Sequence, residues 1–328
     1  MMSKTAQGHD RHQEKKRMQG LGAALASALF MGMTPVFGKQ AIVFGMHPLT
    51  VVALRTILAA LLLALSLLLF KRSYLYIYPA GLLGCALAGG VNGLGSLLFY
   101  SALGRIDASL GQLLYSIYPL FVAGWLWLDG QPPNRVTIAR LMLAIPAVYL
   151  LLQTASGQVD WVGIFLMLGA SALYALHLPI NQRVLYDMPA PTVTLYTLLS
   201  MSMVVLSAYL FTSFGKVIPE PQPQAWGAVL GLTLVTFVSR LTLFLGVKHL
   251  GGMQTALIGL GELLVTVLGA HLLLHERLTV LQWTGAILLM VNILLASIDR
   301  NPPRPTPHGW LRWISPPSLP PDFPWQPR

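Results

Sequence analysis

The chain has 328 residues, of which 55% are hydrophobic and only 10% are charged, with a net charge of +10. Soluble domains carry about a quarter charged residues, so this balance excludes an ordinary soluble fold and predicts an all-α integral membrane protein. Nucleic-acid binding is not predicted, because the basic residues are spread over loops and tails rather than clustered with aromatic residues.

A membrane-spanning helix needs about 20 mostly apolar residues. After a basic N-terminus at residues 1–18, stretches of this kind recur along the chain. The first of them lacks a small-x-small cleavage site at its far end, so we interpret it as a retained helix and not as a signal peptide. The ten predicted spans are about 19–39, 48–70, 76–100, 106–128, 135–153, 160–182, 191–214, 225–247, 252–274 and 278–298.

The distribution of Lys and Arg between the short loops predicts the orientation. If the N-terminus is cytoplasmic, the inner side receives most of the basic residues, including Lys71, Arg72, Arg183 and Lys248. We therefore expect a protein of the inner (plasma) membrane with both termini in the cytoplasm. The tail at residues 300–328 is rich in proline, which favours an extended or unstructured segment.

The two halves of the chain, residues 19–153 and 154–299, resemble each other at an offset of 144 residues, which is the separation of Pro35 and Pro179. The same offset makes Tyr118 the counterpart of Glu262. Five helices per half would place the halves in opposite orientations. This inverted-repeat plan is typical of secondary transporters with a substrate site near the midplane.

A resemblance to a known family is carried by segments such as "SALGRIDASLGQLLYSIYPLF" and "GMQTALIGLGELLVTVLGAHLLLHERLT". Over about residues 18–299 the chain resembles the EamA-type, ten-helix members of the drug/metabolite transporter superfamily. Glu262, Glu276 and Gly285 fit positions of the family pattern, whereas Leu263 stands where the family often has proline. The resemblance implies transport of a small polar or amphipathic metabolite, such as an amino acid, often as export.

An ionisable residue at membrane depth is a candidate functional group. Glu262 shares a helix face with Thr255, Gly259, Thr266 and Gly269, and this face predicts either close helix packing or a cavity wall. The matching face of the other half carries Gly111, Tyr115, Tyr118, Val122 and Trp125. The predicted substrate-binding residues are Asn92, Tyr115, Tyr118, Trp125, His177, Arg240 and Glu262.

Several of these residues have alternative interpretations. Arg240 needs a partner at membrane depth, either Glu262 or an anionic substrate group. His177 fits a proton relay or a satisfied buried histidine, and Asn92 fits helix packing or a pocket. Arg55 and Arg140 are expected to snorkel toward the interface, Arg55 as a structural anchor.

The leading interpretation is a secondary transporter that works by alternating access, uses no metal or cofactor, and moves a small-molecule metabolite across the lipid bilayer. Its coupling is either to protons or to no ion. Two alternatives remain: a membrane-embedded metal enzyme that uses His271, His275 and Glu276, and a scaffold or lipid-handling protein that does not transport. A single histidine pair without an H-E-x-x-H motif argues against the enzyme.

Overall fold

A computed structural model describes residues 2–103, 105, 114–151, 160–213, 222–265, 280–295 and 309–311. In these parts of the chain every regular element is a helix. The elements are α1 (Met2–Val43), α2 (Pro48–Phe70), η1 (Arg72–Leu75), α3 (Pro79–Leu103), α5 (Tyr118–Leu128), α6 (Arg135–Leu151), α7 (Trp161–Leu185), α8 (Ala190–Ser213), α9 (Pro223–Leu250), α10 (Gly252–Gly259) and α12 (Val280–Leu295).

Five of these helices are long and apolar enough to cross a membrane, namely α2, α3, α7, α8 and α9. Their positions agree with five of the predicted spans. Shorter apolar helices cover Tyr118–Leu128, Gly252–Val265 and Trp283–Asn292. The all-helical membrane class is therefore as predicted from composition.

Local sequence explains where several helices begin and end. Pro48 and Pro223 stand in the first turn of α2 and α9, where the missing N–H costs nothing. Asp160 caps α7 by accepting hydrogen bonds from the N–H groups of Val162 and Gly163. Gly251, with φ of 90°, separates α9 from α10 in a backbone conformation that side chains with a Cβ rarely adopt.

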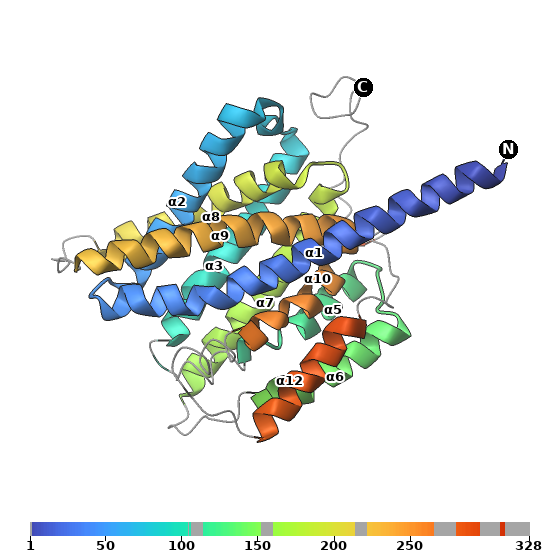
Figure 1. Ribbon diagram of the computed structural model, residues 1–328. Coiled ribbons are helices and arrows are strands. Elements are labelled where there is room, and N and C mark those ends of the chain that lie inside the picture. Colours follow the sequence, from blue (N-terminus) through green and yellow to red (C-terminus); the bar gives the residue numbers. More distant parts are fainter. Residues whose placement is uncertain are drawn as a thin grey trace.

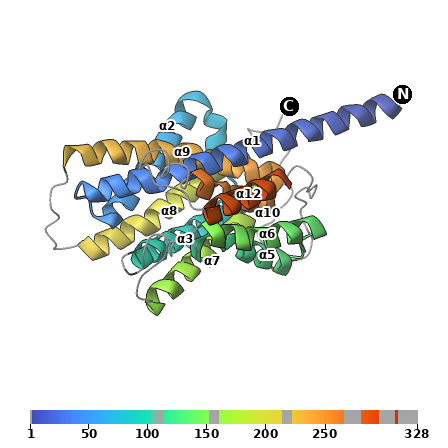
Figure 2. The same ribbon diagram turned by 60° about the horizontal axis from the view of Figure 1, so that its bottom comes forward.

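Helix α1 is longer than the predicted span at 19–39, since it begins at Met2 and includes the basic N-terminal segment. Its N-terminal end projects away from the other helices in both ribbon views (Figures 1 and 2). Charged residues such as Lys15 and Lys16 are good helix formers, so the helix continues where the apolar pattern stops.

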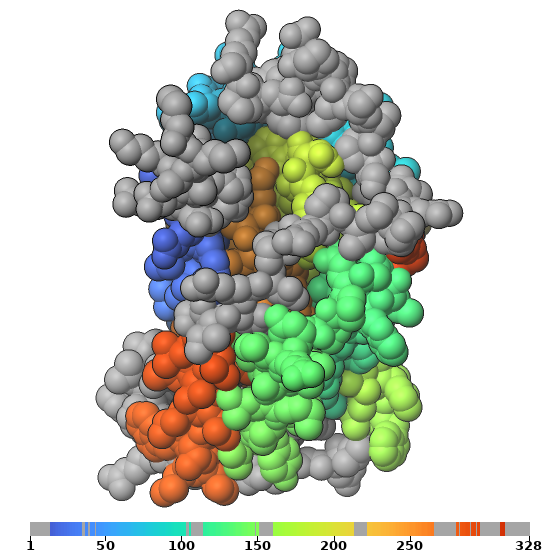
Figure 3. Space-filling view, turned by 90° about the vertical axis from the view of Figure 1, so that its right-hand side faces the viewer, coloured from blue at the N-terminus to red at the C-terminus, as the bar shows by residue number. Residues whose placement is uncertain are grey.

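The helices of the two halves pack against each other. Extensive contacts join α1 to α9, α3 to α7 and α8, α2 to α8 and α9, and α12 to α6. The α6 and α12 helices lie side by side at the bottom of the face seen in Figure 3. If each helix is exchanged for its counterpart in the other half, these pairings map onto one another, which is what two repeats would produce.

The outer surface of the bundle is strongly apolar. Phe70, Phe211, Leu230 and Val280 are all more than half exposed, and Phe211 is 86% exposed. In a soluble monomer an apolar surface this extensive would cause association. A lipid bilayer covers such a surface, which agrees with the membrane class.

The main buried cluster of apolar side chains lies where α5, α7, α9 and α10 meet. It includes Val122, Leu178, Phe244 and Leu257, each at most 1% exposed. Polar and aromatic side chains interrupt this cluster near the middle of α7 and α9, and they form the candidate site.

Candidate functional site

Three tyrosines from the two halves of the chain meet inside the bundle. The ring centroid of Tyr174, on α7, lies 5.3 Å from that of Tyr115 and 5.1 Å from that of Tyr118. The rings of Tyr115 and Tyr118 are 6.1 Å apart. Tyr118 begins α5, and both Tyr118 and Tyr174 are buried. The structure thus places the two predicted tyrosines beside one that the sequence did not single out.

His177 extends this aromatic cluster along α7. Its ring lies 4.7 Å from the ring of Tyr174 and 6.3 Å from that of Phe244. Nδ1 is hydrogen-bonded to the Tyr174 carbonyl, whereas the buried Nε2 makes no hydrogen bond with any described residue. One ring nitrogen is therefore satisfied by the fold, and the other remains available to a ligand or a proton.

Arg240, on α9, faces the same cluster. Its guanidinium carbon lies 5.9 Å from the ring centroid of Tyr174, and the side chain is buried. Its charge is near enough to those of Arg55 and Glu262 to interact with both. However, Nη1 of Arg240 makes no hydrogen bond within the described parts of the chain, and no direct ion pair joins it to Glu262 there.

Glu262 is 7% exposed and lies just beyond α10, in a short helical segment of residues 261–265. Its carboxyl group lies within electrostatic range of Tyr118, Tyr115 and Arg240. Of the predicted site residues, the structure thus brings five into one cluster, namely Tyr115, Tyr118, His177, Arg240 and Glu262.

The two equivalent segments of the repeat touch each other directly. The Tyr118 hydroxyl donates a hydrogen bond of 2.8 Å to the Ala256 carbonyl on α10. A Cβ at Gly259 would overlap this hydroxyl, so glycine is needed for the close approach. A buried carbonyl near a helix end needs such a partner, and the tyrosine of the other half supplies it.

Both segments are interrupted at matching positions. A turn at Ser116 and Ile117 precedes α5, and a turn at Leu260 separates α10 from residues 261–265. Ser116 and Leu260 are 144 residues apart, the offset of the repeat. Discontinuous helices near the midplane are a recurrent feature of substrate sites in secondary transporters.

Asn92 and Trp125 lie outside this cluster. The Asn92 amide is buried on α3 and contacts the sulfur of Met201, on α8, at 3.4 Å. The Trp125 indole donates to the Ala172 carbonyl at 3.2 Å, and its ring lies 6.1 Å from that of Trp310. These contacts favour helix packing for Asn92 and place Trp125 toward the end of α5.

The predicted snorkelling of two arginines is wrong. Arg140 is 0% exposed, donates to the carbonyl of Asn292 at 3.2 Å and is hydrogen-bonded to the side chain of Gln254. Arg55 is 9% exposed and lies 5.8 Å from the ring centroid of Tyr100. Both point into the bundle because buried acceptors or aromatic faces stabilise them there.

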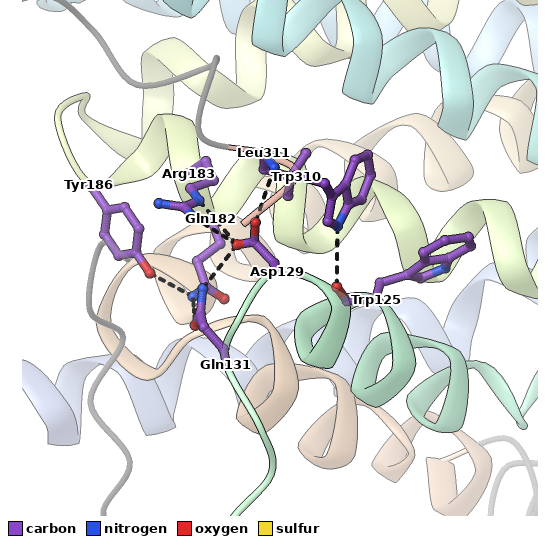
Figure 4. Close-up of polar contacts among 8 residues, drawn as sticks. All are labelled: Trp125, Asp129, Gln131, Gln182, Arg183, Tyr186, Trp310 and Leu311. Atoms are coloured by element: carbon purple, nitrogen blue, oxygen red, sulfur yellow. Dashed lines mark hydrogen bonds and ion pairs between the residues drawn. The ribbon is translucent and has the colours of Figure 1, made fainter. Parts of the chain in front are cut away.

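A second polar group, missed by the sequence analysis, joins the two halves at the far end of α5 (Figure 4). Asp129 accepts from Arg183 at 3.0 Å to Nη2 and 3.1 Å to Nε, and both side chains are almost fully buried, at 0% and 2% exposed. Gln182 donates to Gln131 at 3.1 Å. The only hint in the sequence was the appearance of Asp129 and Gln131 at the end of an apolar stretch.

Gln182 also accepts a hydrogen bond of 2.6 Å from the N–H of Gly252, at the start of α10. This end of α5 is therefore tied to both α7 and α10. Among the described residues no group of three or more metal-binding side chains is present. His271, His275 and Glu276, the basis of the metal alternative, lie outside the described residues, as do Gly111, Thr266 and Gly269.

Comparison with known proteins assigns the family. The sequence pattern described as the EamA-like transporter family matches twice, at residues 18–153 and 161–298. A curated relative, the "Uncharacterized transporter YcbK" of Bacillus subtilis (strain 168), is 25% identical over 206 residues, which are 58% of this chain. The match spans 64% of that relative's length.

One solved structure, described only as the crystal structure of a protein, has the same fold with a TM-score of 0.69. It is 14% identical in sequence, and the match covers 86% of this chain and 97% of that one. The double match of the family pattern agrees with the repeat predicted from the sequence. The chain belongs to the EamA-like transporter family and is a multi-pass membrane protein.

Proposed function

We propose that the protein is a secondary transporter that exports a small metabolite, such as an amino acid, by alternating access. The observation that carries this proposal is the pair of helix interruptions at Ser116–Ile117 and Leu260, with Tyr118 and Glu262 two residues beyond the start of each. Interrupted helices from two related halves frame a site that either half can uncover.

The topology that we propose has ten spans, arranged as two inverted repeats of five at residues 19–153 and 154–299. Five full-length apolar helices and three shorter ones support this arrangement. The bias of basic residues supports an inner-membrane location with the segment 1–18 and the tail 300–328 in the cytoplasm.

The charges around Tyr174 support an amphipathic or zwitterionic substrate. Arg240 and Arg55 bring two positive charges, and Glu262 brings one negative charge. A buried arginine with an unused donor atom needs an anion or water. We assign Arg240 to the substrate carboxylate, Glu262 to its ammonium group or to a proton, and the tyrosines to the walls of the site.

His177 would take a hydrogen bond or a proton through Nε2. We assign Asn92 and Trp125 supporting positions beside the cluster, in line with their contacts to Met201 and Ala172. Proton coupling would act through Glu262 or His177, and a facilitator without a coupling ion is the competing arrangement that the experiment below distinguishes.

Membership of a transporter family does not favour the metal enzyme or the scaffold. Metal analysis of the purified protein tests the first alternative directly. A failure to exchange any solute would favour the second.

The test is counterflow in liposomes loaded with one proteinogenic amino acid at a time, with the same radiolabelled amino acid outside. We expect at least one to accumulate transiently, and a pH gradient to alter the rate if protons are coupled. Glu262→Gln should slow exchange, whereas Glu14→Gln, at an exposed position on α1, should not. No accumulation with any amino acid would contradict the proposal for this substrate class.

A further inference from the structure

A short segment of the C-terminal tail, Gly309–Leu311, packs against the end of α5 (Figure 4). The N–H of Leu311 donates a hydrogen bond of 3.1 Å to Oδ1 of Asp129. The Leu311 side chain is 0% exposed, and the Trp310 ring lies 6.1 Å from that of Trp125. The segment Gly309–Leu311 therefore buries an apolar side chain against the bundle.

The backbone of this segment fits its position closely. Gly309 has φ of 131°, a conformation that residues with a Cβ rarely adopt. A Cβ at Gly309 would also overlap Oδ1 of Asp129 and lie 2.6 Å from its carbonyl oxygen. The contact therefore depends on glycine at this place, and replacement by alanine should prevent it.

The carboxylate that receives the tail is the one that joins the two halves. Oδ2 of Asp129 accepts from Arg183 and from Gln131, while Oδ1 accepts from Leu311. Arg183 belongs to the second half of the chain and Asp129 to the first. The tail is thus a third partner in the ion pair that holds α5 against α7.

We propose that residues 309–311 form an autoinhibitory latch that holds this end of the transporter closed. The proposal rests on the transport function proposed above, because alternating access requires α5 and α7 to separate here. In the structure the latch makes its hydrogen bond and buries Leu311 while Asp129 and Arg183 are paired. A ligand that binds one state better shifts the population toward it, and a tethered segment acts in the same way.

Docking of the latch can be measured without any substrate. Hydrogen–deuterium exchange of the Leu311 amide in the full-length protein should be slow, because this N–H is bonded to a buried carboxylate. Gly309→Ala and Leu311→Asp should each speed that exchange by about tenfold or more. Leu311→Met, which keeps an apolar side chain of similar size, should leave it slow.

Closure by the latch can be measured with a buried thiol. Val122 is 0% exposed and lies on α5 between Tyr118 and Asp129. In a Cys85→Ala background, Val122→Cys would be labelled by a membrane-impermeant maleimide added on the side that carries the C-terminus. We expect Gly309→Ala to raise the labelling rate by about tenfold and Leu311→Met to leave it unchanged.

These outcomes separate the latch from the transport proposal. If no amino acid exchanges but both tail variants speed exchange at Leu311 and labelling at residue 122, the proposed substrate class is wrong and the latch stands. Equal labelling rates with native and altered tails would overturn the latch. Rapid exchange of the Leu311 amide in the native chain would overturn it as well.

Discussion

The buried ion pair between Asp129 and Arg183 gives the sharpest prediction for stability. Arg183→Met removes the positive partner of a buried carboxylate that also accepts hydrogen bonds from the neutral donors Gln131 and Leu311. Breaking one side of a buried pair costs about 3–5 kcal/mol, because the remaining charge is left uncompensated. Asp129→Leu should cost a similar amount, since the Arg183 guanidinium cannot become neutral.

The double variant Asp129→Leu/Arg183→Met removes both charges. Replacement of a whole buried pair by apolar residues is often nearly neutral. Here the Gln131 side chain and the Leu311 N–H also lose their acceptor, which adds about 1–3 kcal/mol to the loss of unfolding free energy in the double variant. We therefore expect the double variant to lose less stability than either single variant.

The measurement is unfolding by denaturant in detergent micelles for the native chain, the two single variants and the double variant. Arg105→Gln is the matched control, because its contact with Asp160, at 3.4 Å, is partly exposed, with side chains 52% and 33% exposed. This control should unfold like the native chain. Single-variant losses under about 1 kcal/mol, or losses that simply add in the double variant, would refute the argument.

Three further predictions concern separate contacts. Gly259→Ala should destabilise the protein by about 1–3 kcal/mol through overlap with the Tyr118 hydroxyl. In a Tyr118→Phe background, which lacks this hydroxyl, the same change should cost clearly less, and an equal cost in both backgrounds would place the overlap elsewhere. Arg140→Met should cost about 2 kcal/mol or more because buried acceptors lose their donor, whereas Arg135→Met, at an exposed position, should change the same unfolding free energy by under about 0.5 kcal/mol. Hydrogen bonds from the Gly163 and Val162 N–H groups, together with Arg105, hold the pKa of Asp160 below its usual value. The ionised Asp160 therefore stabilises the fold fully at neutral pH, and this stabilisation is lost as the pH falls below about 4. The melting-temperature deficit of Asp160→Ala should shrink over that range, and a deficit independent of pH would contradict this prediction.

Hydropathy predicted the membrane class, the internal offset predicted the repeat, and the resemblance of its motifs predicted the family. The offset of 144 residues paired Tyr118 with Glu262, and in the structure Tyr118 contacts the helix that precedes Glu262. Spacing along a helix is enough to place residues on one face. Tyr115, His177 and Arg240, which were also predicted to bind substrate, lie in the same cluster in the structure.

Long-range pairings could not be predicted in the same way. Asp129 and Arg183 are 54 residues apart, and Arg183 was interpreted as a charge in an inner loop. Arg140 was assigned to the interface because an isolated arginine near a helix end usually reaches water. Its partners, Gln254 and Asn292, come from helices whose packing one sequence does not reveal.

The interruption at Leu260 was also missed. Leu260 stands between Gly259 and Gly261, which are poor helix formers, and Pro119 marks the related interruption before α5. The tail contact was missed for another reason. Composition predicts that a proline-rich segment is extended, but it does not show that Gly309–Leu311 has a complementary surface at Asp129.

The central claim is that a solute passes through the cluster between the two halves. The most direct test is the counterflow rate of an amino acid that the native protein exchanges, measured for Arg240→Gln, Glu262→Gln and the double variant. We predict that each single change slows counterflow by about tenfold or more and that the double change is no worse than the slower single one. The control variant Asn92→Ala, whose side chain lies outside the cluster, should exchange the amino acid at nearly the native rate. Native counterflow rates in both Arg240→Gln and Glu262→Gln would contradict the account.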